Sequence, residues 1–330
     1  MPHPVRLWAA AMVLTAAPIA PVLAQQPEQF ELAGSDITLS NLIGTVRVEA
    51  ASGAIATAEV TRQGADGAKL TVRQSGGKLS VVFPGKNFVY PALGGNYESS
   101  IRVQDDGSFS GDWADNGGRT VKISARGTGL TAWADIRLLI PAGARVSIKL
   151  GVGKVSLANV DGTIEVNTAN GDVEGKATTG ALSIDTGSGD VTLTGHKGGL
   201  TVDTGSGDIS LAGVTTDLLS LDTGSGDVLV TGAAVRVIRV DTGSGDVRIE
   251  LTGDIDELSV DTGSGDVEVS APKSLGAAVS LETSSGDITT DFPIQVTRKS
   301  GDGLTGTIGD GKGRMSIETA SGDVRLKQRP

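Results

Sequence analysis

The chain has 330 residues, with 48 glycines, no cysteine and a net charge of −11. An acidic chain lacks the basic face that binding to a nucleic acid or to anionic lipid requires. A chain without cysteine has no disulfide framework. Its apolar positions are mostly Val, Ile and Leu and follow no long helical period, which predicts an all-β protein.

Residues 1–24 have the features of a secretory signal peptide. Arg6 supplies a positive charge, residues 7–17 are apolar but too few to span a bilayer, and small residues precede a cleavage point at Gln25. We expect an exported chain in the periplasm, on the outer surface or secreted, with no membrane span after signal removal. Loss of Arg6 changes the charge from −11 to −12 in the mature chain.

Residues 25–150 are expected to form an irregular β-rich part. Runs that alternate apolar with polar residues predict strands at 37–39, 44–48, 55–62, 69–73, 78–83, 120–125 and 133–140. Pro84 ends the fifth run, because proline cannot donate a hydrogen bond to a strand ladder.

A loop at 84–119 is rich in Gly, Asn, Asp and Ser and carries five aromatic residues: Phe88, Tyr90, Tyr97, Phe109 and Trp113. Loops of this length are uncommon unless they are functional or disordered. One interpretation is a binding surface, since exposed aromatics on loops are common recognition groups. The other is a small core that covers the open end of the β-structure that follows.

From residue 151 onward one phrase, Asp-Thr-Gly-Ser-Gly-Asp, organises the sequence, and it occurs five times between 185 and 266. With the looser copies ending at Asp172, Asp287 and Asp323, the last Asp recurs after 18, 18, 19, 19, 20, 21 and 36 residues. A period of about 20 residues is typical of a solenoid. We predict a single-stack parallel β-solenoid of 18–21-residue coils over 151–330, capped by the irregular part. Residues 151–154 resemble a degenerate first copy, with Lys154 in place of Asp.

Alternation within the repeat predicts inner columns of aliphatic side chains stacked about 4.8 Å apart. The two glycines of each Asp-Thr-Gly-Ser-Gly-Asp copy are expected to turn the chain at a corner, the glycine corner. Before this corner, the inner column contains, in chain order, Leu182, Leu200, Leu219, Ile238, Leu258, Val279 and Met315. Beyond the corner it is Val191, Ile209, Val228, Val247, Val267, Ile288 and Val324. Glycine allows the positive φ or the close approach of coils that the corner needs. The threonines from Thr186 to Thr262 are expected to form a hydroxyl ladder along it.

Two outer columns consist of carboxylates, where each neighbouring pair costs about 1 kcal/mol in water before screening. One runs from Asp185 to Asp261, and the other contains Asp190, Asp208, Asp227, Asp246 and Asp266. Either each carboxylate accepts backbone N–H bonds at its own turn, or the second column binds Ca²⁺. One such turn per coil supplies about half the ligands of the nine-residue calcium β-roll repeat. No other cofactor is expected.

Three enzyme-like motifs do not fit their chemistry. Asp-Thr-Gly-Ser is the aspartic-protease signature, but that mechanism needs two carboxylates from two lobes and not one stacked column. Residues 306–313 match a phosphate-binding loop, but Gly313 stands where Ser or Thr would hold Mg²⁺, and a strand follows. His196 is the single histidine of the mature chain, so we expect neither a zinc site nor a catalytic triad.

The period is interrupted at 289–314, where we expect an extruded hairpin or a degenerate coil. The final residues, 324–330, are expected to end the stack, because their charges and Pro330 block further strand addition.

The chain resembles a bacterial family of β-strand repeat proteins known as putative adhesins, a domain-of-unknown-function family. The resemblance is carried by the strand-rich start at 41–48, Ile140-Pro141-Ala142-Gly143, the repeated Thr-x-Ser-Gly-Asp-Val turns, and Gly306-Thr307-Ile308-Gly309 before the last Ser-Gly-Asp. Together these features cover roughly residues 30–327. The resemblance implies an envelope-associated β-solenoid with no assigned catalysis, and it transfers no site residues.

We therefore expect an exported, non-catalytic β-solenoid of the cell envelope with an adhesin-like or scaffold role, whose partner is an envelope protein or a glycan. One alternative is a calcium-binding surface protein similar to a β-roll. The other is a carbohydrate-active β-helix enzyme, which would need one pair of carboxylates about 5–10 Å apart in a cleft. Regular ladders offer many equivalent pairs and no cleft.

Overall fold

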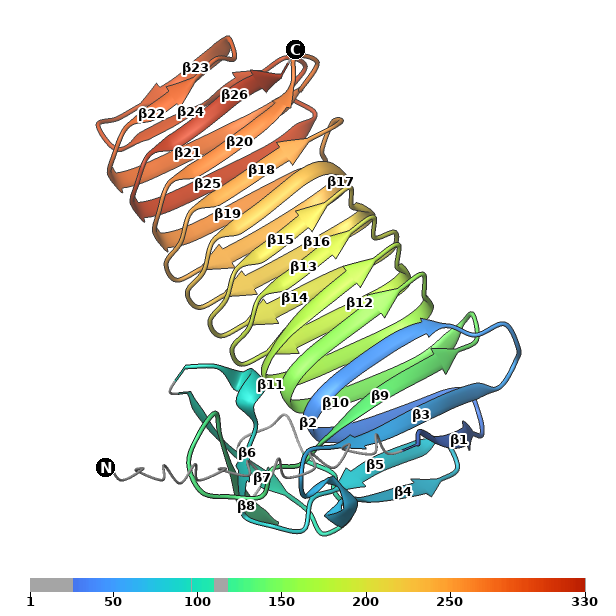
Figure 1. Ribbon diagram of the computed structural model, residues 1–330. Helices are drawn as coiled ribbons and strands as arrows, with labels where there is room; N and C mark the ends of the chain where they lie inside the picture. Colours follow the sequence, from blue (N-terminus) through green and yellow to red (C-terminus); the bar gives the residue numbers. More distant parts are fainter. Residues whose placement is uncertain (1–25, 96, 110–117, 330) are drawn as a thin grey trace, which may run out of the picture.

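The computed structural model describes residues 26–95, 97–109 and 118–329, so the signal peptide predicted at 1–24 lies outside the described residues. Within them the protein is all-β, as predicted, with two short 3₁₀ helices and no α-helix. Neither of these helices has the length or hydropathy needed to cross a membrane. The strands form an elongated stack of coils on a wider base (Figure 1).

The base and the first coils contain β1 (Glu28–Leu32), β2 (Asp36–Ala50), β3 (Ala56–Gln63), η1 (Gly67–Lys69), β4 (Thr71–Ser75), β5 (Lys78–Val82), β6 (Asn87–Val89), η2 (Pro91–Leu93), β7 (Glu98–Val103), β8 (Arg119–Ser124), β9 (Trp133–Ile140), β10 (Ala144–Ala158) and β11 (Asp161–Lys176). The middle of the stack contains β12 (Thr179–Thr186), β13 (Val191–Thr194), β14 (Leu200–Thr204), β15 (Ile209–Ala212), β16 (Thr215–Thr223), β17 (Val228–Thr242), β18 (Val247–Leu251), β19 (Glu257–Ser264) and β20 (Val267–Pro272). The far end contains β21 (Ala277–Ser285), β22 (Ile288–Thr290), β23 (Ile294–Lys299), β24 (Gly303–Ile308), β25 (Gly313–Ser321) and β26 (Val324–Arg329).

Consecutive coils pair in parallel and in register, which makes the fold like a parallel β-solenoid. In the first wall, which precedes the glycine corner of each coil, Leu182 of β12 pairs with Leu200 of β14, and Leu200 pairs with Leu219 of β16. In the second wall, beyond the corner, Val191 of β13 pairs with Ile209 of β15. The predicted sequence period is therefore the spacing between neighbouring strands.

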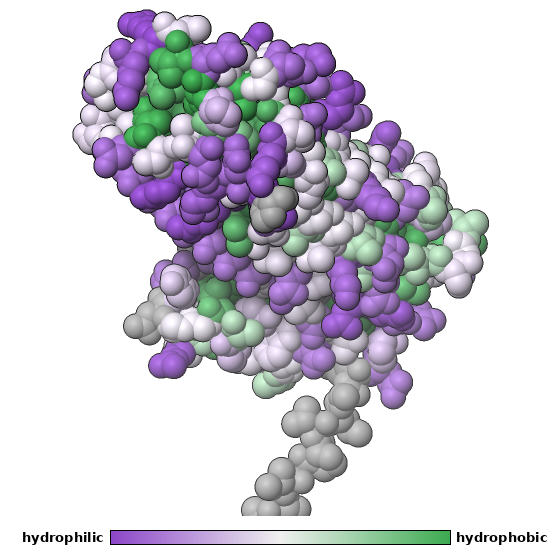
Figure 2. All heavy atoms as spheres, turned by 90° about the horizontal axis from the view of Figure 1, so that it is seen from above, coloured by the Kyte–Doolittle hydropathy of each residue, from purple (hydrophilic) through white to green (hydrophobic). Residues whose placement is uncertain are grey.

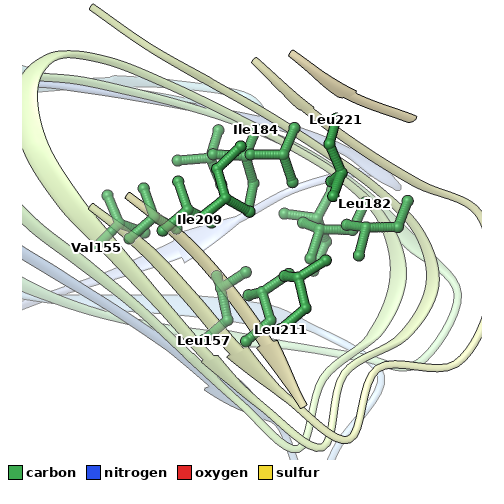
Figure 3. Packing of buried hydrophobic residues seen from close by; sticks show 14 of the residues in the cluster. Val155, Leu157, Leu182, Ile184, Ile209, Leu211 and Leu221 are labelled. Atoms are coloured by element: carbon green, nitrogen blue, oxygen red, sulfur yellow. The ribbon is translucent and has the colours of Figure 1, made fainter. Parts of the chain in front are cut away.

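The two walls enclose one aliphatic core (Figure 3). Leu182, Ile184 and Leu221 point inward from the first wall, and Ile209 and Leu211 point inward from the second wall. None of these five is more than 4% exposed. Burial of an aliphatic side chain contributes about 1.5–3 kcal/mol, so the repeated columns stabilise the stack along its whole length.

The glycine corner shows both features expected from the sequence, a positive φ and a close approach of neighbouring coils. Gly245 has a φ of +147°, which side-chain-bearing residues rarely adopt. A Cβ atom at Gly245 would also overlap the carbonyl oxygen of Gly226 in the preceding coil. The glycine therefore permits both the turn and the close approach of two coils.

The threonine column does not form the continuous hydroxyl ladder that we expected. Thr168 donates to the hydroxyl of Thr186 at 2.7 Å, but Thr223 donates to the carbonyl oxygen of Gly207 at 3.3 Å. The buried hydroxyl of Thr262 has no hydrogen-bond partner within the described part of the chain. The close approach at the corner brings a glycine carbonyl within reach, and this carbonyl competes for the hydroxyl proton.

The two walls are not separate sheets, because some strands run through a corner and belong to both walls. β17 pairs with β18 through residues 228–233 and with β19 through residues 237–242. β10 and β11 likewise pair with each other on both sides of the corner. As a result, 23 strands belong to one hydrogen-bonded network.

The far end of the stack departs from chain order, which corrects the predicted columns. Met315 of β25 pairs with Leu258 of β19 on one side and with Val279 of β21 on the other. In the second wall, Val324 of β26 lies between Val267 and Ile288 in the same way. The last coil of the chain is therefore inserted between two earlier ones, and residues 324–329 do not end the stack as predicted.

An antiparallel hairpin ends the stack instead, in the stretch 289–314 where we expected a hairpin or a degenerate coil. β23 pairs antiparallel with β24, and β24 pairs antiparallel with β21. The reversed direction and a register shift between Val296 and Arg298 interrupt the parallel pattern. Figure 2 views the molecule from this end, where hydrophobic side chains are visible among hydrophilic ones. Val296 is 51% exposed there.

At the other end, regular stacking already includes β2. Arg47 of β2 lies opposite Ser156 of β10 in parallel register, and β9 pairs with the other edge of β2. A separate sheet of β6, β8 and β7 lies at the base of the stack (Figure 1). The division of the mature chain into parts 25–150 and 151–330 stays a prediction.

Candidate functional site

A hollow of about 560 Å³ lies on the outer face of the second wall, where the stack meets the base. Five neighbouring strands form this face in the order β3, β9, β2, β10 and β11. Side chains alternate along each strand, so the inward residues belong to the core and the outward residues line the hollow.

Two rows of outward side chains cross these five strands. Their cross-strand register gives one row of Glu59, Arg137, Arg47, Ser156 and Glu174, and a second row of Thr61, Asp135, Thr45, Lys154 and Asp172. Each row has a small hydroxyl residue near its middle, between longer side chains. These short residues form the floor, and the long charged side chains form the rim.

The acidic groups of the hollow already have partners. Asp135 accepts hydrogen bonds from the Thr45 backbone N–H at 3.1 Å and from the Thr45 hydroxyl at 2.8 Å. Glu59 accepts from Arg137 at 3.5 Å. Glu174 forms an ion pair with Lys154. The carboxylates are therefore neutralised or hydrogen-bonded within the site.

The arginines of the hollow differ in their partners. The guanidinium of Arg137 donates to Glu49 at 3.0 and 2.7 Å, and these bonds raise the pKa of Arg137. Arg47 lies directly opposite Arg137 on the neighbouring strand, and it has no ion pair or hydrogen bond among the described residues. Like charges that face each other across strands are destabilising. The hollow therefore holds one cation, Arg47, that forms no ion pair with a described residue.

The second acidic column runs along the same wall and ends at this hollow. From Asp172 to Asp323, each carboxylate accepts a backbone N–H bond from the aspartate of the next coil, and not from its own turn as we expected. The Oδ1 atom of Asp208, for example, accepts from the N–H of Asp227 at 2.8 Å. The column is thus part of the hydrogen bonding between coils.

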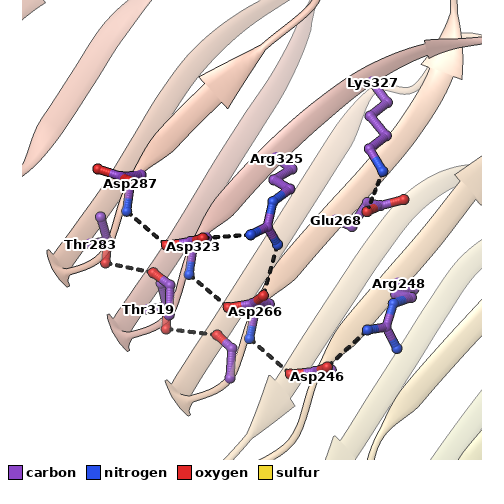
Figure 4. Close-up of polar contacts among 12 residues, drawn as sticks. Asp246, Arg248, Asp266, Glu268, Thr283, Asp287, Thr319, Asp323, Arg325 and Lys327 are labelled. Carbon is purple, nitrogen blue, oxygen red and sulfur yellow. Dashed lines mark hydrogen bonds and ion pairs between the residues drawn. The ribbon is translucent and has the colours of Figure 1, made fainter.

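Figure 4 shows this ladder at the inserted C-terminal coil. The backbone N–H of Asp323 donates to the carboxylate of Asp266 at 2.9 Å. The guanidinium of Arg325 donates to the carboxylates of Asp266 and Asp323. The N–H of Asp323, followed by the guanidinium of Arg325, lowers the pKa of Asp266. The ladder and an added cation therefore hold the last coil in its place.

The first acidic column has no such bonds, and its like charges are less well compensated. Asp203 pairs with Asp185 on one side and with Asp222 on the other. Burial raises the pKa of Asp203, and the charge of Asp185 adds to the effect. Burial also raises the pKa of Asp222, with contributions from Asp203 and Asp241.

The predicted calcium ligands Asp190, Asp208, Asp227, Asp246 and Asp266 all lie in the hydrogen-bonded column, one above another. Across the described residues, no group of three or more His, Cys, Asp or Glu side chains is arranged to hold a metal ion. Calcium binding stays one of the two interpretations of this column, and its test is given below.

The predicted aromatic binding residues are mostly in the core. Phe88, Tyr90 and Phe109 are at most 7% exposed. Phe88 packs edge to face with Phe83 at a ring distance of 5.3 Å. These side chains belong to the buried hydrophobic cluster that continues into the stack, an arrangement closer to the second of the two interpretations. Tyr97 is 67% exposed, and Trp113 lies outside the described residues, so a binding role for this pair stays a prediction.

His196 is fully buried and structural. Its Nδ1 atom lies 2.8 Å from the Thr178 hydroxyl, and its Nε2 atom lies 3.1 Å from the carbonyl oxygen of Gly198. This arrangement fits a neutral ring that donates from Nε2 to the carbonyl and accepts from Thr178. Burial lowers the pKa of His196.

Sequence reasoning missed the hollow, although one signal for it was visible. Lys154 stands at the position where later coils carry Asp, and the register confirms that it lies opposite Asp172. The contribution of Arg47 could not be found in this way, because β2 is separated from β10 by 93 residues in the chain. Only the pairing of these two strands places both cations on one face.

A family model described as Toastrack DUF4097 matches residues 37–327. No curated protein matches the chain. Among solved structures, one described as a putative adhesin from Bacteroides fragilis NCTC 9343 is 12% identical, with a TM-score of 0.43 over 92% of this chain and 96% of that chain. One described as a putative cell adhesion protein from Clostridium sporogenes ATCC 15579 is 11% identical, with a TM-score of 0.25 over 92% of this chain and 100% of that chain. These likenesses are low, so the family model alone identifies the family.

Proposed function

The chain belongs to the Toastrack DUF4097 family, and we propose that it is an exported, non-catalytic protein of the cell envelope with an adhesin-like or scaffold role. The family membership confirms the resemblance predicted from the repeats. The family description assigns no activity, so the proposal rests on the chemistry of this chain.

The observation that carries the proposal is the hydrogen-bonded aspartate ladder. The repeated carboxylates, which are the chemically conspicuous groups of this sequence, each accept a backbone N–H from the neighbouring coil. Their role in coil-to-coil bonding supports a structural wall, since a glycosidase would need one pair of unlike acids in a cleft. The signal peptide predicted at 1–24 supports export of this wall.

The proposal can be tested by following the full chain in a bacterial host and by measuring its binding. We expect the chain in the envelope or medium fraction, with Gln25 as its first residue. We also expect the purified mature chain to bind isolated cell envelopes in a saturable manner. Recovery of a cytoplasmic chain that still begins at Met1 would contradict export. Linear, non-saturable retention by envelopes would contradict an adhesin-like or scaffold role.

A further inference from the structure

The hollow on the second wall is the part of the described surface where the repeated acidic pattern changes sign. Moving from the stack toward the base, the row that begins with Asp172 continues with Lys154 and then with Thr45. The neighbouring row places Arg47 and Arg137 side by side. The lining contains three cationic and three carboxylate side chains, so the hollow is locally neutral in a chain with a net charge of −11, and an anionic group can approach a guanidinium there.

Arg47 is the group that is free to bind this anion. Arg137 is engaged by Glu49 and Glu59, and Lys154 by Glu174. No described residue forms an ion pair with Arg47, so the five N–H donors of its guanidinium are available to a ligand. A carboxylate matches the two-pronged geometry of a guanidinium, and its charge would also offset the repulsion between Arg47 and Arg137.

The surroundings of Arg47 favour a ligand that carries hydroxyl groups as well as a carboxylate. Ser156 lies beside Arg47 in the floor, and Thr61 lies at the edge of the same hollow. Glu174 lies one strand beyond Ser156 in the same row, where its oxygens can accept hydrogen bonds from ligand hydroxyls, whereas Glu59 lies beyond Arg137 on the other side of Arg47. A simple anion would use only the centre of the site.

The size of the hollow is suitable for such a ligand. Its volume of about 560 Å³ lies within the range of small-molecule sites, about 300–1,000 Å³. The lining contains backbone and alternating polar side chains of five paired strands, so the site is built on rigid elements.

We propose that the hollow around Arg47 binds a carboxylate-bearing sugar, with the carboxylate on the guanidinium of Arg47 and the sugar hydroxyls between Ser156 and Glu174. This inference rests on the proposed binding role and names its ligand class. The expected dissociation constant for a single sugar is about 1 mM, because a monosaccharide has few atoms with which to gain affinity.

The test is a titration of the full mature chain with glucuronate, followed by ligand-observed NMR or calorimetry. Glucose, inorganic phosphate and triglutamate are titrated in parallel. We expect glucuronate to bind at least about tenfold more tightly than each of the other three, because only glucuronate combines the carboxylate with the hydroxyls. Equal or tighter binding of phosphate or of triglutamate would overturn the sugar assignment.

Two variants locate the site, and one serves as a control. Arg47→Gln removes the charge, and Ser156→Leu fills the floor; each is expected to weaken glucuronate binding by at least about tenfold. Arg145→Gln is the control, because Arg145 is likewise an exposed arginine, but it lies in the part of β10 that belongs to the first wall, opposite Asp36. Its affinity is expected to be unchanged. Equal losses in Arg47→Gln and Arg145→Gln would show that the effect is one of net charge and would refute the site.

The same variants separate this inference from the proposed function. If the parent chain binds envelopes saturably but does not bind glucuronate, the sugar site is refuted and the adhesin-like or scaffold role stands. If the chain binds glucuronate through Arg47 but is found in the cytoplasm, the site stands and the envelope role is refuted.

Discussion

The two acidic columns differ in their bonding, and this difference predicts opposite responses to the same substitution. Asp203, Asp222 and Asp241 are neighbours in the first column, whose carboxylates repel one another. Replacing all three by Asn removes this charge and leaves the side-chain size nearly unchanged. We expect the triple variant to be more stable than the parent at neutral pH.

The magnitude follows from the spacing of the strands. Unit charges about 4.8 Å apart repel by about 0.9 kcal/mol in water, and by about 0.5 kcal/mol after screening at 0.1 M salt. The triple variant removes four neighbouring pairs, including those with Asp185 and Asp261. The total is about 2 kcal/mol, and about 1–2 kcal/mol is expected after allowing for repulsion that persists in the unfolded chain.

The pH dependence has a definite sign. Burial and neighbouring carboxylates raise the pKa values of Asp203 and Asp222, so the folded chain binds these protons more readily than the unfolded chain. The column therefore lowers stability at neutral pH, and this penalty is removed as the pH falls through the raised folded-state values. The advantage of the triple variant should shrink on acidification, and also at high salt.

The assay is chemical denaturation followed by circular dichroism at pH 7.5, in about 0.02 M and 0.5 M salt. The matched control is the triple variant Asp190→Asn, Asp208→Asn and Asp227→Asn in the second column. There the relief of repulsion is offset by the weaker hydrogen bonds that amide oxygens accept, so no net gain is expected. Equal stabilisation by both triple variants, or a gain that salt does not reduce, would refute this reasoning.

Three further predictions concern the corner, the buried histidine and calcium. Gly245→Ala should destabilise the chain by more than about 3 kcal/mol, because the new Cβ overlaps the Gly226 carbonyl oxygen, whereas Gly253→Ala meets no atom within 4 Å and should be nearly neutral; denaturation of the pair checks this. Because burial lowers the pKa of His196, the parent should lose stability as the pH falls below about 6.5, and the stability gap to His196→Gln should narrow between pH 7 and pH 5; a constant gap would contradict this. Because the second-column carboxylates already bond between coils, about 5 mM Ca²⁺ should not shift the melting temperature; a rise of several degrees that a chelator reverses would restore the calcium hypothesis.

The regular part of the fold could be predicted because its physical causes repeat. The aliphatic columns and the glycine corner occur once per coil, so the sequence period equals the spacing between paired strands. The backbone N–H group that each aspartate carboxylate accepts was harder to predict. A carboxylate can accept an N–H from its own turn or from the next coil, and the two possibilities have the same sequence pattern.

The hollow and the far end could not be predicted, because both depend on strands that pair out of chain order. The residues between β2 and β10 form the base, so nothing in the period shows that Arg47 lies opposite Ser156. In the same way, Met315 fits the inner column equally well after Val279 or before it. A periodic pattern specifies what each position faces, but not the order in which equivalent coils are stacked.

The inserted C-terminal coil has a consequence for how the stack is completed. In a simple solenoid each coil can dock on the one before it, so that structure can grow in chain order. Here β21 lies against β25 and β24, both of which come later in the chain. The edge of β19 is completed by β25 as well. β21 has no parallel neighbour until β25 is present, and β19, which already pairs with β17, has none on its other edge. The two strands are therefore joined only when the last coil docks between them.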